Sequence, residues 1–250
     1  MWIIRPRKGL SRIPVTGSRR LLRATGRTCK IVPLSYLRNL DLEERTDLIQ
    51  YSNNISEYLA DDDIIDFHNE EIRKLSNKLF DKASDEIDYI KLVYEYVRDN
   101  ISHSADINND VITCSASEVL KAGHGICFAK SHLLAVLLRC QSIPAGFCYQ
   151  KLILDDNFAP ELIYHGLNGV FLNKFNKWIR LDARGNKNGV NAQFSTEFEQ
   201  LAFPIRAELG EKDIFVIYPK PDAYVLEKLR VNKNRVELWT NLPDKLAYDK

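Results

Sequence analysis

The chain has 250 residues, of which 45% are hydrophobic and 28% charged, and its formal net charge is +1. This length allows one large domain, or one domain with an accessory segment, and the composition is typical of a soluble globular protein. No apolar run reaches the ~18 residues that a transmembrane helix needs, so no membrane span is expected.

The charge is unevenly distributed along the chain. Residues 1–40 hold ten Lys or Arg and no acidic residue, which leaves 25 basic and 34 acidic residues, a net charge of −9, for residues 41–250. We predict a basic, flexible extension at 1–40 and a mildly acidic domain over 41–250, which does not favour nucleic acid as a partner. The extension fits an Arg-rich transit peptide, an arm that contacts anionic surfaces, or an unstructured or wrongly started extension. It lacks the continuous apolar region of a secretory signal.

The first half of this domain is predicted to be helical. A helix-start pattern begins at Asp41, and apolar residues recur near helical spacing between Ile65 and Phe80. Residues 84–100 predict an amphipathic helix, and residues 101–114 are polar and predict a loop. A further helix, apolar nearly all round, is expected from Cys127 to about Arg139, which places it in the middle of the fold.

The second half is predicted to contain strands. They are expected over 146–154, 166–172, 178–182 and 213–218, followed by a short helix over 224–229. The fold class is therefore α+β, in which N-terminal helices, including the one that begins at Cys127, pack on an antiparallel sheet.

Cys127 is the most informative residue. It follows the turn Gly123-His-Gly-Ile and begins an apolar helix. A helix N-terminus carries unpaired N–H groups and partial positive charge, which favours the reactive thiolate. Cys127 is therefore a candidate nucleophile that should react with iodoacetamide well below pH 8.5, whereas Cys140 and Cys148 should react far more slowly.

The other cysteines indicate the setting of the chain. The five cysteines are an odd number and form no CxxC or other metal-ligand spacing. A disulfide framework and a zinc enzyme are therefore disfavoured. We expect a cytoplasmic protein with a free reactive thiol, with no metal and no cofactor.

A nucleophilic cysteine needs a base and a group that orients the base. Among the five histidines, His165 is favoured because it is predicted to begin a strand, a rigid place for a base. If His165 directly faces Asp182 in an antiparallel pair, the hairpin folds at Asn173-Lys174, a plausible tight turn. Directly opposed side chains are close enough for a hydrogen bond, so we predict a triad of Cys127, His165 and Asp182. A register shift of one residue would separate the last two.

These residues carry a resemblance to a known family. The segments Gly123-His-Gly-Ile-Cys127-Phe-Ala, Ile143-Pro-Ala-Gly-Phe, His165-Gly-Leu-Asn-Gly-Val-Phe-Leu and Trp178-Ile-Arg-Leu-Asp182 resemble the transglutaminase-like superfamily, in the form of a small single-domain microbial protein. The resemblance covers about residues 84–190, the expected core. It implies a papain-like cysteine-enzyme fold, with Cys127 as nucleophile, His165 as base and acid, and Asp182 as the orienting group. Many members have Ala-Trp where this chain has Gly166.

The expected function is cysteine-dependent acyl transfer on an amide through a thioester. The substrate would be a peptide, a protein or a small amide, either hydrolysed or transferred to an amine, and hydrolysis is favoured because no dedicated amine site is visible. The backbone N–H of Cys127 is expected to help hold the oxyanion. Further candidates for substrate or oxyanion binding are Gly125, His103, Asn168 and Arg184. The alternative is a non-catalytic interaction module that keeps the fold. The oligomeric state stays open.

Overall fold

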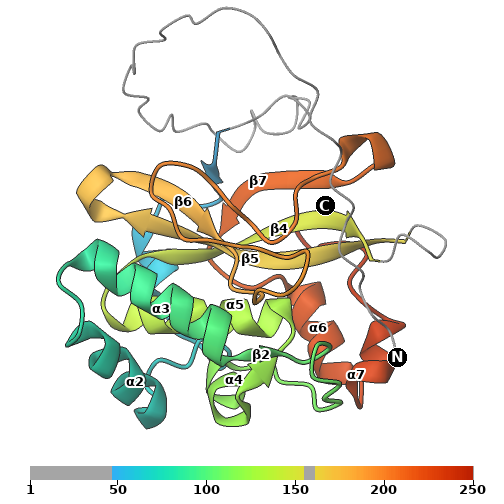
Figure 1. Ribbon diagram of the computed structural model, residues 1–250, viewed down its shortest axis with the longest axis horizontal. Coiled ribbons are helices and arrows are strands. Elements are labelled where there is room, and N and C mark those ends of the chain that lie inside the picture. Colours follow the sequence, from blue (N-terminus) through green and yellow to red (C-terminus); the bar gives the residue numbers. More distant parts are fainter. Residues whose placement is uncertain (1–46, 155–160, 250) are drawn as a thin grey trace, which may run out of the picture.

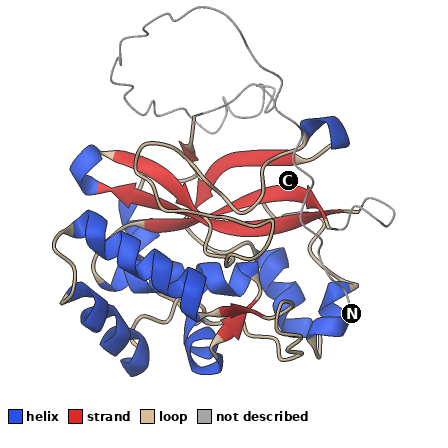
Figure 2. Ribbon diagram, in the orientation of Figure 1, coloured by secondary structure: helices blue, strands red, loops and turns tan. Residues whose placement is uncertain are grey.

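The computed structural model describes residues 47–154 and 161–249, which form a mixed α+β fold. Helices cover one face of a twisted five-stranded sheet (Figure 1; Figure 2). The strand order is β1-β7-β4-β5-β6, and neighbours are antiparallel except for β1 and β7, which are parallel. The strands are β1 (Ile49–Gln50), β4 (Ala145–Ile153), β5 (Leu162–Leu172), β6 (Lys177–Leu181) and β7 (Lys212–Tyr218).

Helix α5 lies at the centre of the fold. Twelve of its fourteen residues are buried, so its sequence is apolar on nearly every side. Its neighbours are α2, α3 and α4 on one side and strands β4 and β5 on the other. The helices are α2 (Glu70–Phe80), α3 (Glu86–Asn100), α4 (Ala116–Ala122), α5 (Cys127–Cys140), α6 (Ala223–Val231) and α7 (Arg235–Trp239), with short 3-10 turns at η2 (Ile55–Leu59), η3 (Asn173–Phe175) and η4 (Ala207–Leu209).

The glycine-rich turn before α5 fixes where that helix begins. Helix α4 ends at Gly123, whose φ of 70° lies in the left-handed region that glycine adopts at low cost. The chain then forms the two-residue strand β3 (His124–Gly125), which pairs in parallel with β2 (Ser102–His103). This pairing holds the turn against the segment that follows α3, and Cys127 emerges two residues later.

Several elements differ from the sequence prediction. The predicted helix 84–100 begins at Glu86, because the Asp85 side chain accepts the Asp88 N–H and acts as the N-cap. The predicted strand 166–172 extends back to Leu162, so His165 lies inside a strand and not at its start. The predicted loop 101–114 contains β2. The helix-start pattern at Asp41 and the basic segment 1–40 lie outside the described residues.

Several short elements were not predicted. Strand β1 adds a parallel edge to a sheet that was expected to be wholly antiparallel, and α4 and α7 are short helices. Helix α4 has a full capping box, in which Ser115 accepts the Glu118 N–H while the Glu118 carboxylate accepts the Ser115 N–H. Two-residue strands and helices of five to seven residues carry too little periodic pattern to be recognised in a sequence.

Candidate active site

Cys127 is the first residue of α5. The N-cap residue Ile126 provides no side-chain hydrogen bond, so the first turn of the helix keeps unpaired backbone N–H groups. The thiol is half-buried, whereas the residues that follow it in the helix are buried. The helix start therefore presents a thiol and free N–H donors together, as its sequence predicted.

His165 and Asp182 meet in the interior of the protein. The His165 Nε2 and the Asp182 Oδ2 are 2.8 Å apart, and both side chains are almost fully buried. The Cys127 thiol lies close enough to the same imidazole ring to raise its pKa. Because Nε2 is occupied by Asp182, Nδ1 is the ring nitrogen left for the thiol. The three residues predicted from the sequence are therefore brought together.

Backbone groups support the Asp182 carboxylate. Its Oδ1 accepts the Arg184 N–H at 3.0 Å, and its Oδ2 also accepts the Ala202 N–H at 3.1 Å. Burial raises the pKa of Asp182. The His165 ring and these N–H groups together lower it by more than burial raises it, so the net shift of the pKa is downward. The carboxylate therefore stays ionised beside the imidazole.

The environment of His165 favours its protonated form. Burial lowers the pKa of His165, but the Asp182 carboxylate and the Cys127 thiol raise it more strongly, to about 10. The ring of Phe203 packs edge-on against the imidazole, with the ring centroids 5.1 Å apart. The site thus holds a positive charge next to the sulfur atom.

The predicted register of the hairpin was wrong by two residues. The structure pairs Asn168 with Leu181 and Leu172 with Lys177, and the connection is the η3 turn rather than a two-residue turn at Asn173-Lys174. His165 therefore lies beyond the paired part of β6, and Asp182 approaches it diagonally from the end of that strand. A shift of two residues keeps both side chains on the same face, so the hydrogen bond still forms.

Gly166 lets β5 approach the nucleophile helix closely. A Cβ atom at this position would lie only 2.6 Å from Cδ1 of Phe128, the residue after Cys127. The ring of Phe128 thus occupies the space that a larger residue next to His165 would need. This contact fixes the distance between the strand that carries the histidine and the helix that carries the cysteine.

Gly166→Ala is expected to lower the free energy of unfolding by about 1–3 kcal/mol, because the added methyl group overpacks this contact. Gly169→Ala is the matched control, since its Cβ would also lie 2.6 Å from a side-chain carbon, that of Ile217. Denaturant unfolding measures both costs, and only Gly166→Ala should also slow the alkylation of Cys127. Phe128→Leu should recover much of the stability lost in Gly166→Ala, and no recovery would contradict this account.

Two of the further candidates lie beside the start of α5. His103 and Gly125 are paired residues of β2 and β3, and both are buried. The Nδ1 atom of His103 is buried and has no hydrogen-bond partner among the described residues. Burial and the Arg184 charge hold the pKa of His103 well below its usual value, so this imidazole is neutral. A Cβ at Gly125 would lie 3.0 Å from Thr113 Oγ1, so this glycine serves close packing.

The other two candidates make structural contacts instead. The Asn168 amide group donates to the carbonyls of Ser131 and Gly146, which joins α5 to the sheet. The Arg184 guanidinium forms a two-pronged ion pair with Asp106, with N–O distances of 2.5 and 2.9 Å. Both side chains are buried, and of their polar groups the Asn168 Oδ1 has no hydrogen-bond partner among the described residues.

Sequence reasoning missed three contributors to the site. The backbone N–H of Ala202 and the ring of Phe203 come from the long segment after β6, which has no periodic pattern that marks it. Lys130 lies one turn after Cys127 and is fully buried. The sequence does mark Lys130 as unusual, because a lysine on the buried face of an apolar helix needs specific hydrogen-bond acceptors.

The remaining histidines are engaged elsewhere. His124 hydrogen-bonds with Ser104 through Nδ1, and His132 hydrogen-bonds with the Cys114 carbonyl. His68 is exposed and pairs with Asp61. In the part of the chain that the structure describes, no group of three or more His, Cys, Asp or Glu side chains could hold a metal ion, and no helix there is long and apolar enough to cross a membrane.

Comparisons with solved structures give partial likenesses. A Cytophaga hutchinsonii protein with the name "Putative Cysteine Protease" matches with 19% identity and a TM-score of 0.43 over 62% of this chain and 45% of that chain. The periplasmic domain of TgpA from Pseudomonas aeruginosa matches with 14% identity and a TM-score of 0.36 over 46% and 42%. Red sea bream transglutaminase matches with 10% identity and a TM-score of 0.34 over 51% and 27%. The chain spans less than half the length of these proteins, and likenesses of this size carry no functional argument.

The family comparison is more specific. No curated protein matches the chain. The family model of the transglutaminase-like superfamily matches residues 73–183. This segment runs from α2 to the end of β6 and contains Cys127, His165 and Asp182. Over this segment, the chain is similar to the transglutaminase-like superfamily.

Proposed function

We propose that the protein is a cysteine-dependent acyl-transfer enzyme that acts on amides, with Cys127 as nucleophile, His165 as base and acid, and Asp182 as the orienting group. The observation that carries this proposal is the 2.8 Å contact between His165 and Asp182, beside a thiol at the start of a helix. Covalent catalysis by cysteine requires a nucleophile, a base beside it and a group that orients the base.

The reaction follows from the contacts. The Cys127 sulfur attacks the amide carbonyl carbon, a C–S bond forms, and the carbonyl oxygen takes up negative charge. The unpaired N–H groups at the start of α5, including that of Cys127, are placed to donate to this oxygen. His165 then gives its proton to the departing amine as the C–N bond breaks, which leaves a thioester.

The second half-reaction restores the enzyme. His165 removes a proton from water, the resulting hydroxide oxygen attacks the thioester carbonyl, and the C–S bond breaks. A second amine in place of water would give transfer rather than hydrolysis. We favour hydrolysis of a peptide, protein or small amide, because the sequence indicates no dedicated amine site.

Alkylation tests this proposal without knowledge of the substrate. Cys127 and Cys140 lie at opposite ends of α5 and are both half-buried, which makes Cys140 the matched control. Burial raises the pKa of the Cys140 thiol and raises that of Cys148 to about 12. At pH 6.5, iodoacetamide is expected to label Cys127 at least about ten-fold faster than either, because the thiolate is the reactive form.

Turnover is the second arm of the test. The wild type, Cys127→Ala and Cys140→Ala are incubated with a panel of amide, ester and thioester acyl donors, with and without added amines. Mass spectrometry should detect an acyl adduct on Cys127 in the wild type and in Cys140→Ala, and none in Cys127→Ala. Equal, slow labelling of all thiols together with no adduct would point to an interaction module that keeps the fold.

A further inference from the structure

Lys130 is buried one turn after Cys127 in α5, on the helix that carries the nucleophile. Its Nζ donates to the carbonyl oxygens of Arg98, at 3.4 Å, of Ile101, and of Arg184, at 3.0 Å. An ammonium group has three N–H donors, and each one has a backbone acceptor here. The charged side chain is thus fully coordinated by main-chain oxygens from two other segments.

These acceptors tie α5 to the segment that holds Asp182. Arg98 and Ile101 belong to the end of α3, where the last carbonyls of a helix have no partner within it. Arg184 lies two residues beyond Asp182, and its own N–H donates to the Asp182 Oδ1. The main chain of Arg184 is therefore held on one side by the catalytic carboxylate and on the other by Lys130.

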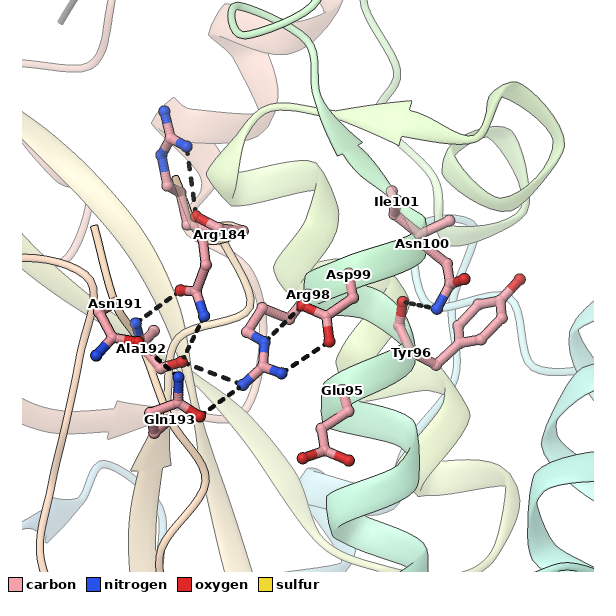
Figure 3. A network of polar contacts seen from close by, with 12 residues as sticks. Glu95, Tyr96, Arg98, Asp99, Asn100, Ile101, Arg184, Asn191, Ala192 and Gln193 are labelled. Atoms are coloured by element: carbon pink, nitrogen blue, oxygen red, sulfur yellow. Dashed lines mark hydrogen bonds and ion pairs between the residues drawn. The ribbon is translucent and has the colours of Figure 1, made fainter. Parts of the chain in front are cut away.

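The same segment is held from α3 by a second cation. Figure 3 shows the Arg98 guanidinium reaching from the end of α3 to the Ala192 carbonyl, at 3.1 Å, and to the Gln193 side chain, at 3.2 Å. The Asn186 side chain closes this loop by accepting the Ala192 N–H and donating to its carbonyl. Lys130 thus lies where α5, the end of α3 and the chain after Asp182 meet.

The approach of this chain to Lys130 is close. Gly185 has a φ of 107°, which favours glycine, and a Cβ there would lie 3.2 Å from the Arg98 carbonyl oxygen and 3.3 Å from Lys130 Nζ. Burial and the Arg184 charge lower the pKa of Lys130 to about 7, while the Asp182 charge raises it. An apolar residue of similar volume would pack at this position without the cost of burying a charge. Core packing alone therefore does not explain why this position holds a cation.

We propose that Lys130 is a positioning residue that fixes Asp182 relative to Cys127, so that His165 is held between the carboxylate and the thiol. The inference rests on the proposed acyl-transfer function. Without the ammonium, the Arg184 carbonyl loses its partner, the turn after β6 relaxes, and Asp182 no longer orients the imidazole. The thiol then loses its charged neighbour.

Lys130→Met tests this role, and Arg139→Met is its control. Arg139 is buried at the other end of α5, where its guanidinium donates to the carbonyls of Ala60, Ala145 and Pro219. Both variants remove from α5 a buried cation that donates to backbone carbonyls of other segments, so both should lose stability in denaturant unfolding. Only Lys130→Met should slow iodoacetamide labelling of Cys127 at pH 6.5, by about ten-fold, and move its pH profile towards that of an ordinary thiol.

Gly185→Ala provides a second, milder perturbation of the same contact. It keeps the lysine but pushes the chain after Asp182 away from Nζ, and it should move the pH profile in the same direction as Lys130→Met. The inference would be overturned if Cys127 alkylation keeps its wild-type pH profile in a folded Lys130→Met protein or in Gly185→Ala. Loss of folding in both variants would also overturn it. These results differ from failure of the proposed function, in which the wild type itself shows no preferential labelling of Cys127.

Discussion

Replacing Asp182 by Asn is expected to lower the turnover of the acyl donor by roughly 10²–10⁴-fold, since the orienting charge of the histidine is lost. Asp182 accepts the His165 Nε2–H at 2.8 Å and is the strongest influence that raises the histidine pKa. An amide side chain can keep the shape of this contact but not its charge, and it can present an NH₂ group to the ring in place of an acceptor. The loss should appear in kcat rather than in KM, because the Asp182 side chain has no exposed surface for a substrate to contact.

The control is another buried aspartate. Asp222 has no exposed surface, and its carboxylate accepts the N–H groups of Tyr224, Val225 and Tyr248 around the start of α6. Asp222→Asn should cost stability and leave kcat close to that of the wild type. If both variants lose activity in proportion to their loss of stability, Asp182 is structural and the triad is wrong. If no substrate has been found, the rate of Cys127 alkylation at pH 6.5 serves as the readout.

The three central residues of the site could be predicted because each has a local signal. Cys127 follows a glycine-rich turn and starts an apolar helix, and both features are confirmed. The contact between His165 and Asp182 follows from the periodicity of strands, which survives an error of two residues in the register. The η3 turn that caused this error ends at Asn176 in the left-handed conformation, and no local pattern had indicated it.

The supporting contacts could not be predicted, because they depend on the three-dimensional path of the chain. Arg184 follows Asp182 in the sequence and was a candidate for substrate binding, yet its partner Asp106 is 78 residues away. The same holds for Asn168, whose acceptors lie on α5 and β4. Lys130 interrupts the apolar helix visibly, but its carbonyl acceptors come from backbone that carries no sequence signature. A buried polar residue therefore indicates from the sequence that it needs hydrogen-bond partners, but the sequence does not identify those partners.

The free energy of unfolding of the wild type is expected to fall as the pH rises from about 6.5 towards 10. The folded protein raises the pKa of His165 from 6.5 to about 10, so the folded state binds the imidazole proton more tightly than the unfolded state does. The stabilisation is complete below pH 6.5 and is lost as the pH rises through the folded value. The depressed pKa of Asp182 gives the opposite trend in acid, so the pair stabilises the fold best between about pH 4 and 6.5.

The difference between wild type and Asp182→Asn isolates this effect, because other groups that titrate above pH 7 are present in both proteins. The wild-type advantage should be largest near pH 6 and shrink by an amount on the order of 1–4 kcal/mol by pH 10. Denaturant unfolding at half-unit steps of pH measures it. Cys127→Ser should retain part of the decline, since Asp182 raises the histidine pKa more strongly than the thiol does. Parallel curves for wild type and Asp182→Asn would mean that His165 is not protonated in the folded protein, and the positive charge assigned to the site beside the sulfur atom would then be wrong.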